Sequence, residues 1–248
     1  MRWLVLSDIH SNLEALVEAL KAAEGRYSAI VCLGDLVGYG PDPNAVVGWA
    51  RENLAVCVRG NHDKASCDPE VASGFHYAAR AAAEWTHDQL TETNRQYLQS
   101  LPQGPWPVGG FQIVHGSLRD EDKYLVSRSD AYEEFGGMNP GLVFFGHTHQ
   151  QGGYTEDSNG FLQEVRPILF RGCSRVALEL LGGEKYLLNP GSVGQPRDED
   201  IRAAFCLYDD TCRQVEYWRV PYPVEKTQRR MEEFGLPDSL VQRLSFGH

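Results

Sequence analysis

Five short apolar runs in the first 150 residues most constrain how this chain can fold. They cover residues 3–6, 29–33, 55–58, 111–114 and 142–145. Between the first three lie two segments, 11–23 and 44–53, in which apolar residues recur at helical spacing. Strands that alternate with helices in this way predict parallel pairing through right-handed crossovers. The first half of the chain is therefore expected to form a buried, largely parallel sheet.

The pattern changes after residue 150, where short runs alternate apolar and polar residues between Gly or Asp turns. These expected strands cover residues 161–170, 175–180, 185–188, 203–208 and 214–220. Such strands are typical of antiparallel pairing. The sequence thus predicts an α/β (α+β layered) fold, a four-layer αββα sandwich of two facing mixed sheets flanked by helices, within a single domain of residues 1–248.

Two further helical regions are predicted. Residues 74–101 are rich in alanine and end before Pro102, so they are expected to form one or two helices over the strand ends. This segment either packs on the sheet or, with His76, Tyr77 and Arg80, covers a substrate; the sequence leaves both interpretations open. A C-terminal helix is expected around residues 224–244.

Composition narrows the possible partners. The chain of 248 residues has a net charge of -11, which argues against a broad nucleic-acid-binding surface, although bound metal ions can reverse the sign locally. Asp8 interrupts the opening apolar run before a signal peptide is complete, and no run reaches transmembrane length. We therefore expect a cytoplasmic protein without a membrane partner; the sequence predicts no oligomeric state.

The six cysteines are scattered, and none forms a Cys-x-x-Cys pair. A chain of this length does not need disulfides to be stable. Cys32 and Cys57 lie within apolar runs, as is typical of reduced core residues. A redox or structural zinc role is not favoured.

Every early apolar run ends in residues that can bind a metal. These are Asp8 and His10, Asp35, Asn61 followed by His62, His115, and His147 with His149. Because the carboxyl ends of parallel strands share one edge of a sheet, the side chains are expected to converge there. Residues two apart on an extended segment point the same way, so Asp8 with His10, and His147 with His149, are each expected to grip one place together.

The donor atoms predict which metals would bind. Carboxylate, imidazole and amide oxygen suit Mn, Fe or Zn better than Ca²⁺. Two divalent ions about 3.5–4 Å apart need a bridging carboxylate, and Asp35 is the candidate. Taken singly, each motif has a plainer interpretation: a helix cap, a turn, a hairpin at residues 60–63, or a packed core histidine. Their coincidence at five strand ends favours a metal site.

These motifs resemble those of a known family. Asp8-Ile9-His10, residues 34–38, residues 60–63, His115 with its neighbours and residues 146–149 match, in order, the motifs of the calcineurin-like metallophosphoesterases. The match spans residues 3–149, and residues 189–194 resemble a later loop of the small prokaryotic phosphodiesterase branch. The set of motifs is highly specific.

The resemblance implies a role for each residue. Asp8, His10 and His149 would hold the first metal, and Asn61, His115 and His147 the second, with Asp35 shared. A water or hydroxide that bridges the metals would attack phosphorus in line. His62 aligns with the family's catalytic histidine, which protonates the leaving oxygen or steadies the transition-state charge.

The sequence departs from the protein-phosphatase branch, which has an Asp and an Arg three and four residues beyond the shared aspartate. Gly38 and Tyr39 stand at those positions. Asp63 is a possible substitute for orienting His62, and Arg59 or Arg197 could bind phosphate oxygens. An N-cap or a surface ion pair is an equally plausible role for each of the three.

The sequence therefore predicts a dinuclear metal-dependent phosphoesterase. Its expected substrate is a phosphodiester or phosphomonoester of a small or nucleotide-like compound. A protein Ser/Thr phosphatase is the first alternative, disfavoured by Gly38 and Tyr39. A non-catalytic scaffold of the same fold is the second, although such members typically lose the catalytic histidine that His62 matches.

Overall fold

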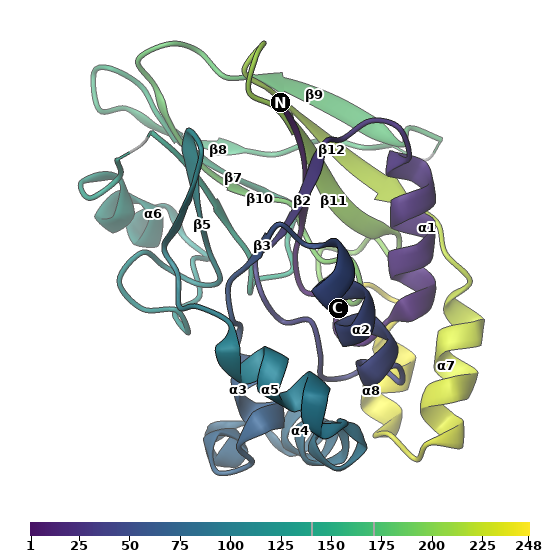
Figure 1. Cartoon of the computed structure of the whole chain (residues 1–248). Coiled ribbons are helices and arrows are strands. Elements are labelled where there is room, and N and C mark those ends of the chain that lie inside the picture. Colours follow the sequence, from purple (N-terminus) through teal and green to yellow (C-terminus); the bar gives the residue numbers. More distant parts are fainter. Residues whose placement is uncertain (140, 171) are drawn as a thin grey trace.

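Two mixed sheets form the body of the protein, in a computed structural model that describes residues 1–139, 141–170 and 172–248. The first has the order β3-β2-β1-β11-β12-β9, with strands Val56–Cys57, Ala29–Cys32, Arg2–Leu6, Ala203–Asp209, Gln214–Val220 and Arg175–Glu179. The second has the order β4-β5-β6-β10-β7-β8, with strands Trp106–Val108, Phe111–Val114, Leu142–Phe145, Lys185–Asn189, Gly152–Glu156 and Leu162–Val165. The two sheets face each other across an apolar cluster to which both contribute, with helices outside them (Figure 1).

Parallel and antiparallel pairing are combined in both sheets. Strands β1, β2 and β3 run parallel, and so do β5, β6 and β10. Strand β1 also pairs antiparallel with β11, and β10 pairs antiparallel with β7. The predicted sandwich of two mixed sheets flanked by helices is confirmed. The later strands are not all antiparallel as expected, because β10 joins the parallel set.

Strand β1 shows how the layers are built. Its Leu4 and Leu6 pack in one apolar cluster with the helices α1 (Leu13–Ala23) and α2 (Pro43–Asn53). Val5, which points the other way, packs in a second cluster between the two sheets. A third cluster joins the outer face of the second sheet to α6 (Arg128–Phe135). The strand is apolar from Trp3 to Leu6 because both of its faces are covered there.

The segment predicted as one or two helices over residues 74–101 forms two. These are α4 (Tyr77–Gln89) and α5 (Glu92–Ser100), which follow a short 3-10 turn, η1 (Val71–Gly74). They are separated at Thr91, whose side chain accepts a hydrogen bond from the Asn94 amide and begins the new helix. Together with α3 (Asn61–Cys67), they lie beyond the strand ends at the bottom of the view in Figure 1.

The expected single C-terminal helix is wrong in one respect. The region forms α7 (Val224–Glu233) and α8 (Asp238–Arg243). Gly235 between them adopts a left-handed φ of 68°, and Pro237 supplies no amide proton to continue the helix. Of the described residues, none belongs to a helix that is both long enough and apolar enough to cross a membrane.

Several elements were not predicted. Strand β4, strand β7 and helix α6 were missed, and the expected strand at 161–170 is limited to Leu162–Val165. Pro167 cannot donate to a strand ladder, which accounts for part of that shortening. Helix α3 (Asn61–Cys67) was also missed. It matters most, because the residues expected at a strand end lie instead in the first turn of a helix.

Candidate metal centre

The loops at the carboxyl ends of the strands have an unusual backbone. Nine non-glycine residues in the described part of the chain have positive φ. Seven of them lie in these loops: Asp8, His10, Ser11, Asp35, Tyr39, His147 and His149. Such conformations cost free energy and persist where the surrounding structure imposes them. The doublets Asp8-x-His10 and His147-x-His149 are therefore tight left-handed turns, and the expectation that they are extended is wrong.

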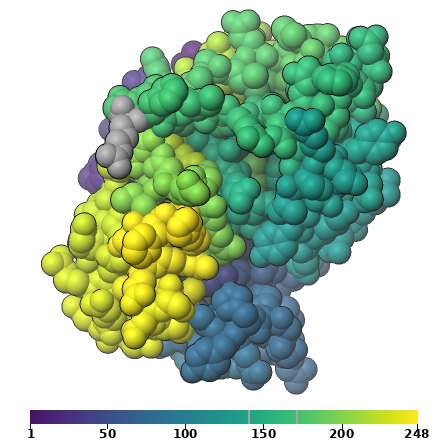
Figure 2. Space-filling model, turned by 180° about the vertical axis from the view of Figure 1, so that it is seen from behind, coloured from purple at the N-terminus to yellow at the C-terminus, as the bar shows by residue number. Residues whose placement is uncertain are grey.

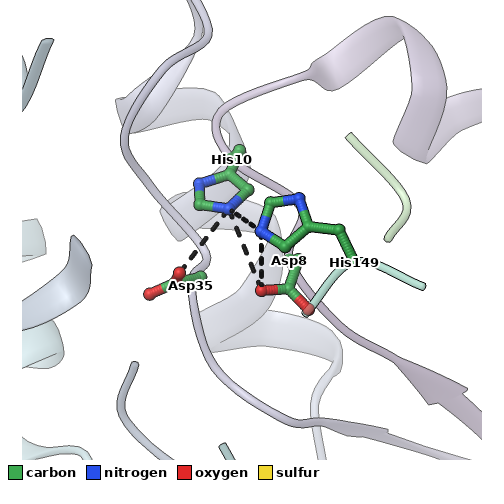
Figure 3. A group of neighbouring side chains, drawn as sticks. All are labelled: Asp8, His10, Asp35 and His149. Atoms are coloured by element: carbon green, nitrogen blue, oxygen red, sulfur yellow. Dashed lines mark hydrogen bonds and ion pairs between the residues drawn. The ribbon is translucent and has the colours of Figure 1, made fainter. Parts of the chain in front are cut away.

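One group of side chains gathers Asp8, His10, Asp35 and His149 (Figure 3). The Nε2 atoms of His10 and His149 lie 3.1 Å apart. His149 Nε2 is 3.3 Å from Asp8 Oδ1, and His10 Nε2 is 3.5 Å from Asp35 Oδ2. All four side chains are buried. Residues from the turns that follow β1, β2 and β6 thus meet at one place.

A second group shares Asp35 with the first and adds His115 and His147. His115 Nε2 lies 3.0 Å from His147 Nδ1 and 3.1 Å from Asn61 Oδ1. His147 and His149 therefore belong to different groups, contrary to the expectation that they grip one place. The left-handed turn between them turns the two rings apart. The division of side chains into two groups is the one that the family resemblance implies.

Asp35 lies between the two groups. Its Oδ2 atom is 3.5 Å from His10 Nε2 in one group and 3.5 Å from His115 Nε2 in the other. Its Oδ1 atom is occupied, because it accepts a hydrogen bond of 2.8 Å from the His62 amide. The carboxylate is thus held with one oxygen facing both groups at equal distance.

The four histidines are oriented by backbone carbonyls. His10 Nδ1 lies 3.0 Å from the Val37 oxygen, and His115 Nδ1 lies 2.8 Å from the Leu33 oxygen. His149 and His147 make the corresponding contacts to the Gln195 and Asp122 oxygens. Since a carbonyl only accepts, each of these ring nitrogens carries the proton. The other nitrogen of a neutral ring then presents a lone pair to the group, as in metal-binding histidines.

The electrostatics of the site favour a bound cation. Burial lowers the pKa of His10 well below its usual value and that of His147 to about 3, so these rings are neutral. Burial also opposes the charge of His115, but Asp35 and Asp8 raise its pKa to about 10. The buried carboxylates of Asp8 and Asp35 therefore stabilise a positive charge beside them. The facing lone pairs of His10 and His149 repel each other unless a cation lies between them.

Asp8 provides the clearest test of the fit to a metal. Its Oδ2 accepts hydrogen bonds from the Ser7 hydroxyl at 2.5 Å and from the His147 amide at 3.1 Å. Its Oδ1 is buried and has no hydrogen-bond partner among the described residues. A buried carboxylate oxygen without a partner is costly, and a cation removes that cost. The donor set therefore fits divalent metal ions.

The loop at residues 189–194 is hydrogen-bonded to the turns that carry the candidate ligands. Ser192 Oγ and the Gly194 amide both donate to the Asp8 carbonyl oxygen, at 2.8 and 3.0 Å. Asn189 Nδ2 donates to the Gly146 oxygen just before His147. A Cβ added at Gly194 would lie 1.9 Å from the Ile9 oxygen, so only glycine fits there. The loop thus positions two of the strand-end turns at once.

His62 belongs to the first turn of α3 and not to an extended loop. Successive residues of a helix point about 100° apart, which directs the Asn61 amide toward His115 while the His62 ring packs elsewhere. That ring lies 4.3 Å from the Tyr39 ring and 4.9 Å from the Phe75 ring. Its Nδ1 has no hydrogen-bond partner among the described residues. Burial lowers the pKa of His62 to about 4.

Comparison with known proteins shows which family the chain belongs to. The sequence profile of the calcineurin-like phosphoesterase superfamily domain matches residues 1–211. The chain belongs to this superfamily. A metallophosphoesterase from Sphaerobacter thermophilus is 37% identical, with a TM-score of 0.85 over 100% of this chain and 99% of its own. An uncharacterized protein of Methanocaldococcus jannaschii is 34% identical over 98% of this chain and 97% of its own.

A hypothetical protein from Pyrococcus horikoshii shares the fold at lower identity. It is 19% identical, with a TM-score of 0.78 over 100% of this chain and 98% of its own. The protein is thus a metallophosphoesterase-family member with candidate metal-binding side chains, and the family is one of hydrolases.

Asp63 and Arg59, which were expected near His62 and the substrate, have other roles in this structure. Asp63 does not orient the His62 ring: its Oδ2 accepts from the Asp35 and Gly60 amides, each at 2.9 Å. It therefore fixes the Asp35 loop to the start of α3. Arg59 forms a two-pronged ion pair with Glu121, whose carboxylate also binds Lys64. Its guanidinium group is already neutralised, and it does not line the cavity at the centre.

A cavity of about 460 Å³ opens beside the second group of ligands. Its lining includes Asn61, His62, His147, Tyr39, Phe75, His76, Tyr124, Arg197 and Arg243. His76 lines it, as a lid residue would, whereas Tyr77 and Arg80 do not. A larger cavity of about 1000 Å³ near Gln151 and Arg219 contains none of the candidate ligands, so the smaller one is the candidate substrate site.

Sequence reasoning included Arg197 but missed Arg243, Tyr124 and Phe75. Tyr124 stacks on His147 with ring centroids 3.7 Å apart. These three residues come from distant parts of the chain and belong to no local motif. Only the tertiary fold brings them to the cavity.

Proposed function

We propose that this protein is a dinuclear metal-dependent phosphoesterase that hydrolyses a phosphodiester or phosphomonoester of a small or nucleotide-like compound. The position of Asp35 carries the proposal. One of its oxygens faces the histidines of both groups at 3.5 Å, as a carboxylate shared by two ions would. Membership of the phosphoesterase superfamily supports the reaction class.

The same residues define the two proposed metal sites. Asp8, His10 and His149 would hold one ion, and Asn61, His115 and His147 the other, with Asp35 shared. Mn, Fe or Zn fits this mixture of carboxylate, imidazole and amide donors. Two such ions would lower the pKa of a bound water and stabilise the charge of a phosphoryl group.

The chain itself supplies groups that would contact the phosphates of the substrate. His62 lines the cavity beside Asn61, and its ring, neutral near pH 7 because burial lowers its pKa to about 4, would donate a hydrogen bond to the leaving oxygen. Its amide holds Asp35, so its position is tied to that of the shared carboxylate. Arg197 lines the same cavity and would bind phosphate oxygens.

The structure gives little support to a protein-phosphatase site. A Cβ added at Gly38 would lie 2.6 Å from His62 Nδ1, so an aspartate cannot stand there unless His62 moves. Tyr39 fills the next position and packs its ring on His62. Nothing in the described chain favours a scaffold over an enzyme, since His62 and all seven candidate ligands are present and grouped.

Metal-dependent hydrolysis tests the proposal. The protein would be stripped with chelator, reloaded with Mn²⁺, Zn²⁺ or Ca²⁺, and assayed on a nitrophenyl monoester and its bis-nitrophenyl diester. We expect activity with Mn²⁺ or another transition ion, poor activity with Ca²⁺, and two metals per chain. Full activity in excess chelator, with no metal found by elemental analysis, would refute the proposal.

A further inference from the structure

Two arginines meet on one side chain at the wall of the candidate substrate cavity. Arg197 donates to Gln195 Oε1 from Nη2 at 2.9 Å, and Arg243 donates to the same oxygen from Nη1 at 3.1 Å. Arg197 also reaches the Tyr39 hydroxyl at 3.4 Å. Two guanidinium groups are thus held close together by a neutral oxygen that cannot cancel their charge.

Neither arginine is neutralised within the described residues. Three other arginines that are buried or partly buried have carboxylate partners: Arg219 pairs with Asp198, Arg202 with Asp200, and Arg230 with Asp42. Arg197 and Arg243 form no ion pair with any carboxylate that the structure describes. Burial and the charge of Arg197 lower the pKa of Arg243.

Gln195 connects this arginine pair to the metal centre. Its backbone oxygen orients His149, with His149 Nδ1 at 2.6 Å, while its side chain binds both arginines. The Gln195 side chain is buried, and its Nε2 has no hydrogen-bond partner among the described residues. The amide is therefore held with its oxygen toward the guanidinium groups even though its own donor is left without a partner.

Arg197 follows the ligand turn, since its amide donates to the His149 oxygen at 3.1 Å, whereas Arg243 reaches it from the end of α8. The C-terminal residues lie beside the segment that contains α4, as yellow next to blue in Figure 2. Contact between the Trp85 and Phe234 rings, with centroids 5.4 Å apart, joins the two regions. Arg243 at the end of α8 and His76 at the start of α4 line the same cavity.

We propose that Arg197 and Arg243 form an anion subsite for a second phosphate group of the substrate. The favoured substrates are then small phosphoesters that carry another phosphate besides the one cleaved, as a 5′-phosphorylated dinucleotide does. Guanidinium groups bind phosphate oxygens through paired, charge-assisted hydrogen bonds. The rings of Tyr39, Tyr124 and Phe75 provide apolar surface for the organic part between the two phosphates. The assignment of the substrate class rests on the proposed function; the anion subsite itself does not.

Binding of inorganic pyrophosphate to metal-free protein tests the subsite without any catalysis. Calorimetry in excess chelator would compare the wild type with Arg243→Gln, Arg243→Lys and Arg229→Gln. Arg229 is a matched control, because it is exposed on α7 and does not line the cavity. We expect Arg243→Gln to weaken pyrophosphate binding at least about tenfold, because it removes a hydrogen bond between charged groups. Arg243→Lys should weaken binding less, and Arg229→Gln should leave it unchanged.

Equal effects of Arg243→Gln and Arg229→Gln, or no pyrophosphate binding by the wild type, would overturn the subsite. Circular dichroism and thermal melting would establish that each variant is folded. If Arg243→Gln did not fold, the comparison of Arg243→Lys with the wild type would decide, since loss of the planar fork alone should weaken pyrophosphate binding.

The substrate class has its own test in the metal-loaded enzyme. The dinucleotide ApA and its 5′-phosphorylated form pApA differ only in the added phosphate. We expect the wild type to have a lower KM for pApA, and Arg243→Gln to raise that KM about tenfold while changing the KM for ApA much less. Equal changes for both substrates would refute the substrate class. Absence of metal-dependent hydrolysis of every ester would instead refute the proposed function, and the pyrophosphate result would still stand.

Discussion

The two sides of the cavity are built in different ways. On the side of the metal centre, short turns at strand ends hold buried side chains whose remaining polar atoms are bound by backbone groups. On the opposite side, η1, α4 and α8 present partly exposed arginine, histidine and aromatic side chains with few fixed partners. Many contacts fix the side chains on the first side, whereas few contacts fix those on the second.

This difference separates chemistry from selectivity. Strained turns persist only where many contacts support them, which suits groups that must keep one geometry. A wall of helix ends and long side chains can be changed without disturbing those turns. Changes on the ligand side should therefore abolish the reaction, whereas changes on the helical side should alter which substrate is used.

The largest effect is expected for Asp35→Asn. The variant keeps the shape of the side chain but removes the charge that both metal groups share, so we expect metal binding and activity to be lost together. Metal stoichiometry and kcat would be measured beside Asp88→Asn, an exposed carboxylate of α4 that should change neither. Retention of two metals by Asp35→Asn would contradict the bridging role.

His62→Ala should lose activity without losing metal. Removing a side chain that assists the leaving oxygen typically costs about 10²–10⁴-fold in rate, and least where the leaving group is already a weak base. We therefore expect two bound metals, a large loss of kcat on nucleoside esters and a much smaller loss on nitrophenyl esters. Equal losses on both ester types would show that His62 does not assist the leaving oxygen.

Gly38→Ala tests how closely His62 must be placed. The added Cβ would lie 2.6 Å from His62 Nδ1, at a backbone φ of 91° that alanine avoids. A displacement of about 1 Å can cost on the order of 10²-fold, so we expect a fall in kcat of roughly tenfold to 100-fold with metal content unchanged. Gly48→Ala in α2, where a Cβ meets no atom within 4 Å, is the control.

The smallest effect is expected for Arg59→Gln, since Arg59 lies outside the cavity. We expect kcat and KM within about twofold of wild type, and a loss on the order of 1 kcal/mol in the free energy of unfolding at pH 7. Although burial raises the pKa of Glu121, its hydrogen bonds to Arg59 and Lys64 lower it below the usual value.

The sign of the pH effect follows from that lowered pKa. Glu121 contributes stability above its unfolded pKa of about 4.3, and the contribution is lost as pH falls through the lower folded pKa. Denaturant unfolding of wild type and Arg59→Gln should therefore differ less at pH 3 than at pH 7. A difference that is constant across this range would mean that the ion pair does not act through Glu121.

Local patterns predicted the ligand side of the cavity well. Strands at 111–114 and 142–145 match the structure residue for residue, because an apolar run followed by Gly and His marks both the strand and its end. The gathering of Asp8 and Asp35 at one edge follows from the parallel pairing of β1 with β2, whereas His115 follows a strand of the second sheet and reaches them only because the two sheets pack together. The predicted backbone conformation of the two doublets was wrong, because alternation along an extended chain does not describe residues that adopt positive φ.

The helical side could not be predicted in the same way. Arg197 and Arg243 are far apart in the sequence and meet only because α8 folds back over the cavity. Arg59 was a plausible phosphate ligand until its pairing with Glu121 was visible. Long charged side chains pair with whatever the tertiary fold brings near them, and periodicity carries no information about that partner.

Asp35 and Asp8 come from the first sheet, whereas His115, His147 and His149 come from the second. Neither sheet alone therefore supplies a complete group of donors, and the His147 amide that binds Asp8 Oδ2 joins the two at this edge. Assembly of the centre must wait until the sheets have docked, so metal affinity reports on how well they fit together. A loaded protein should in turn resist separation of its two halves by the free energy of metal binding.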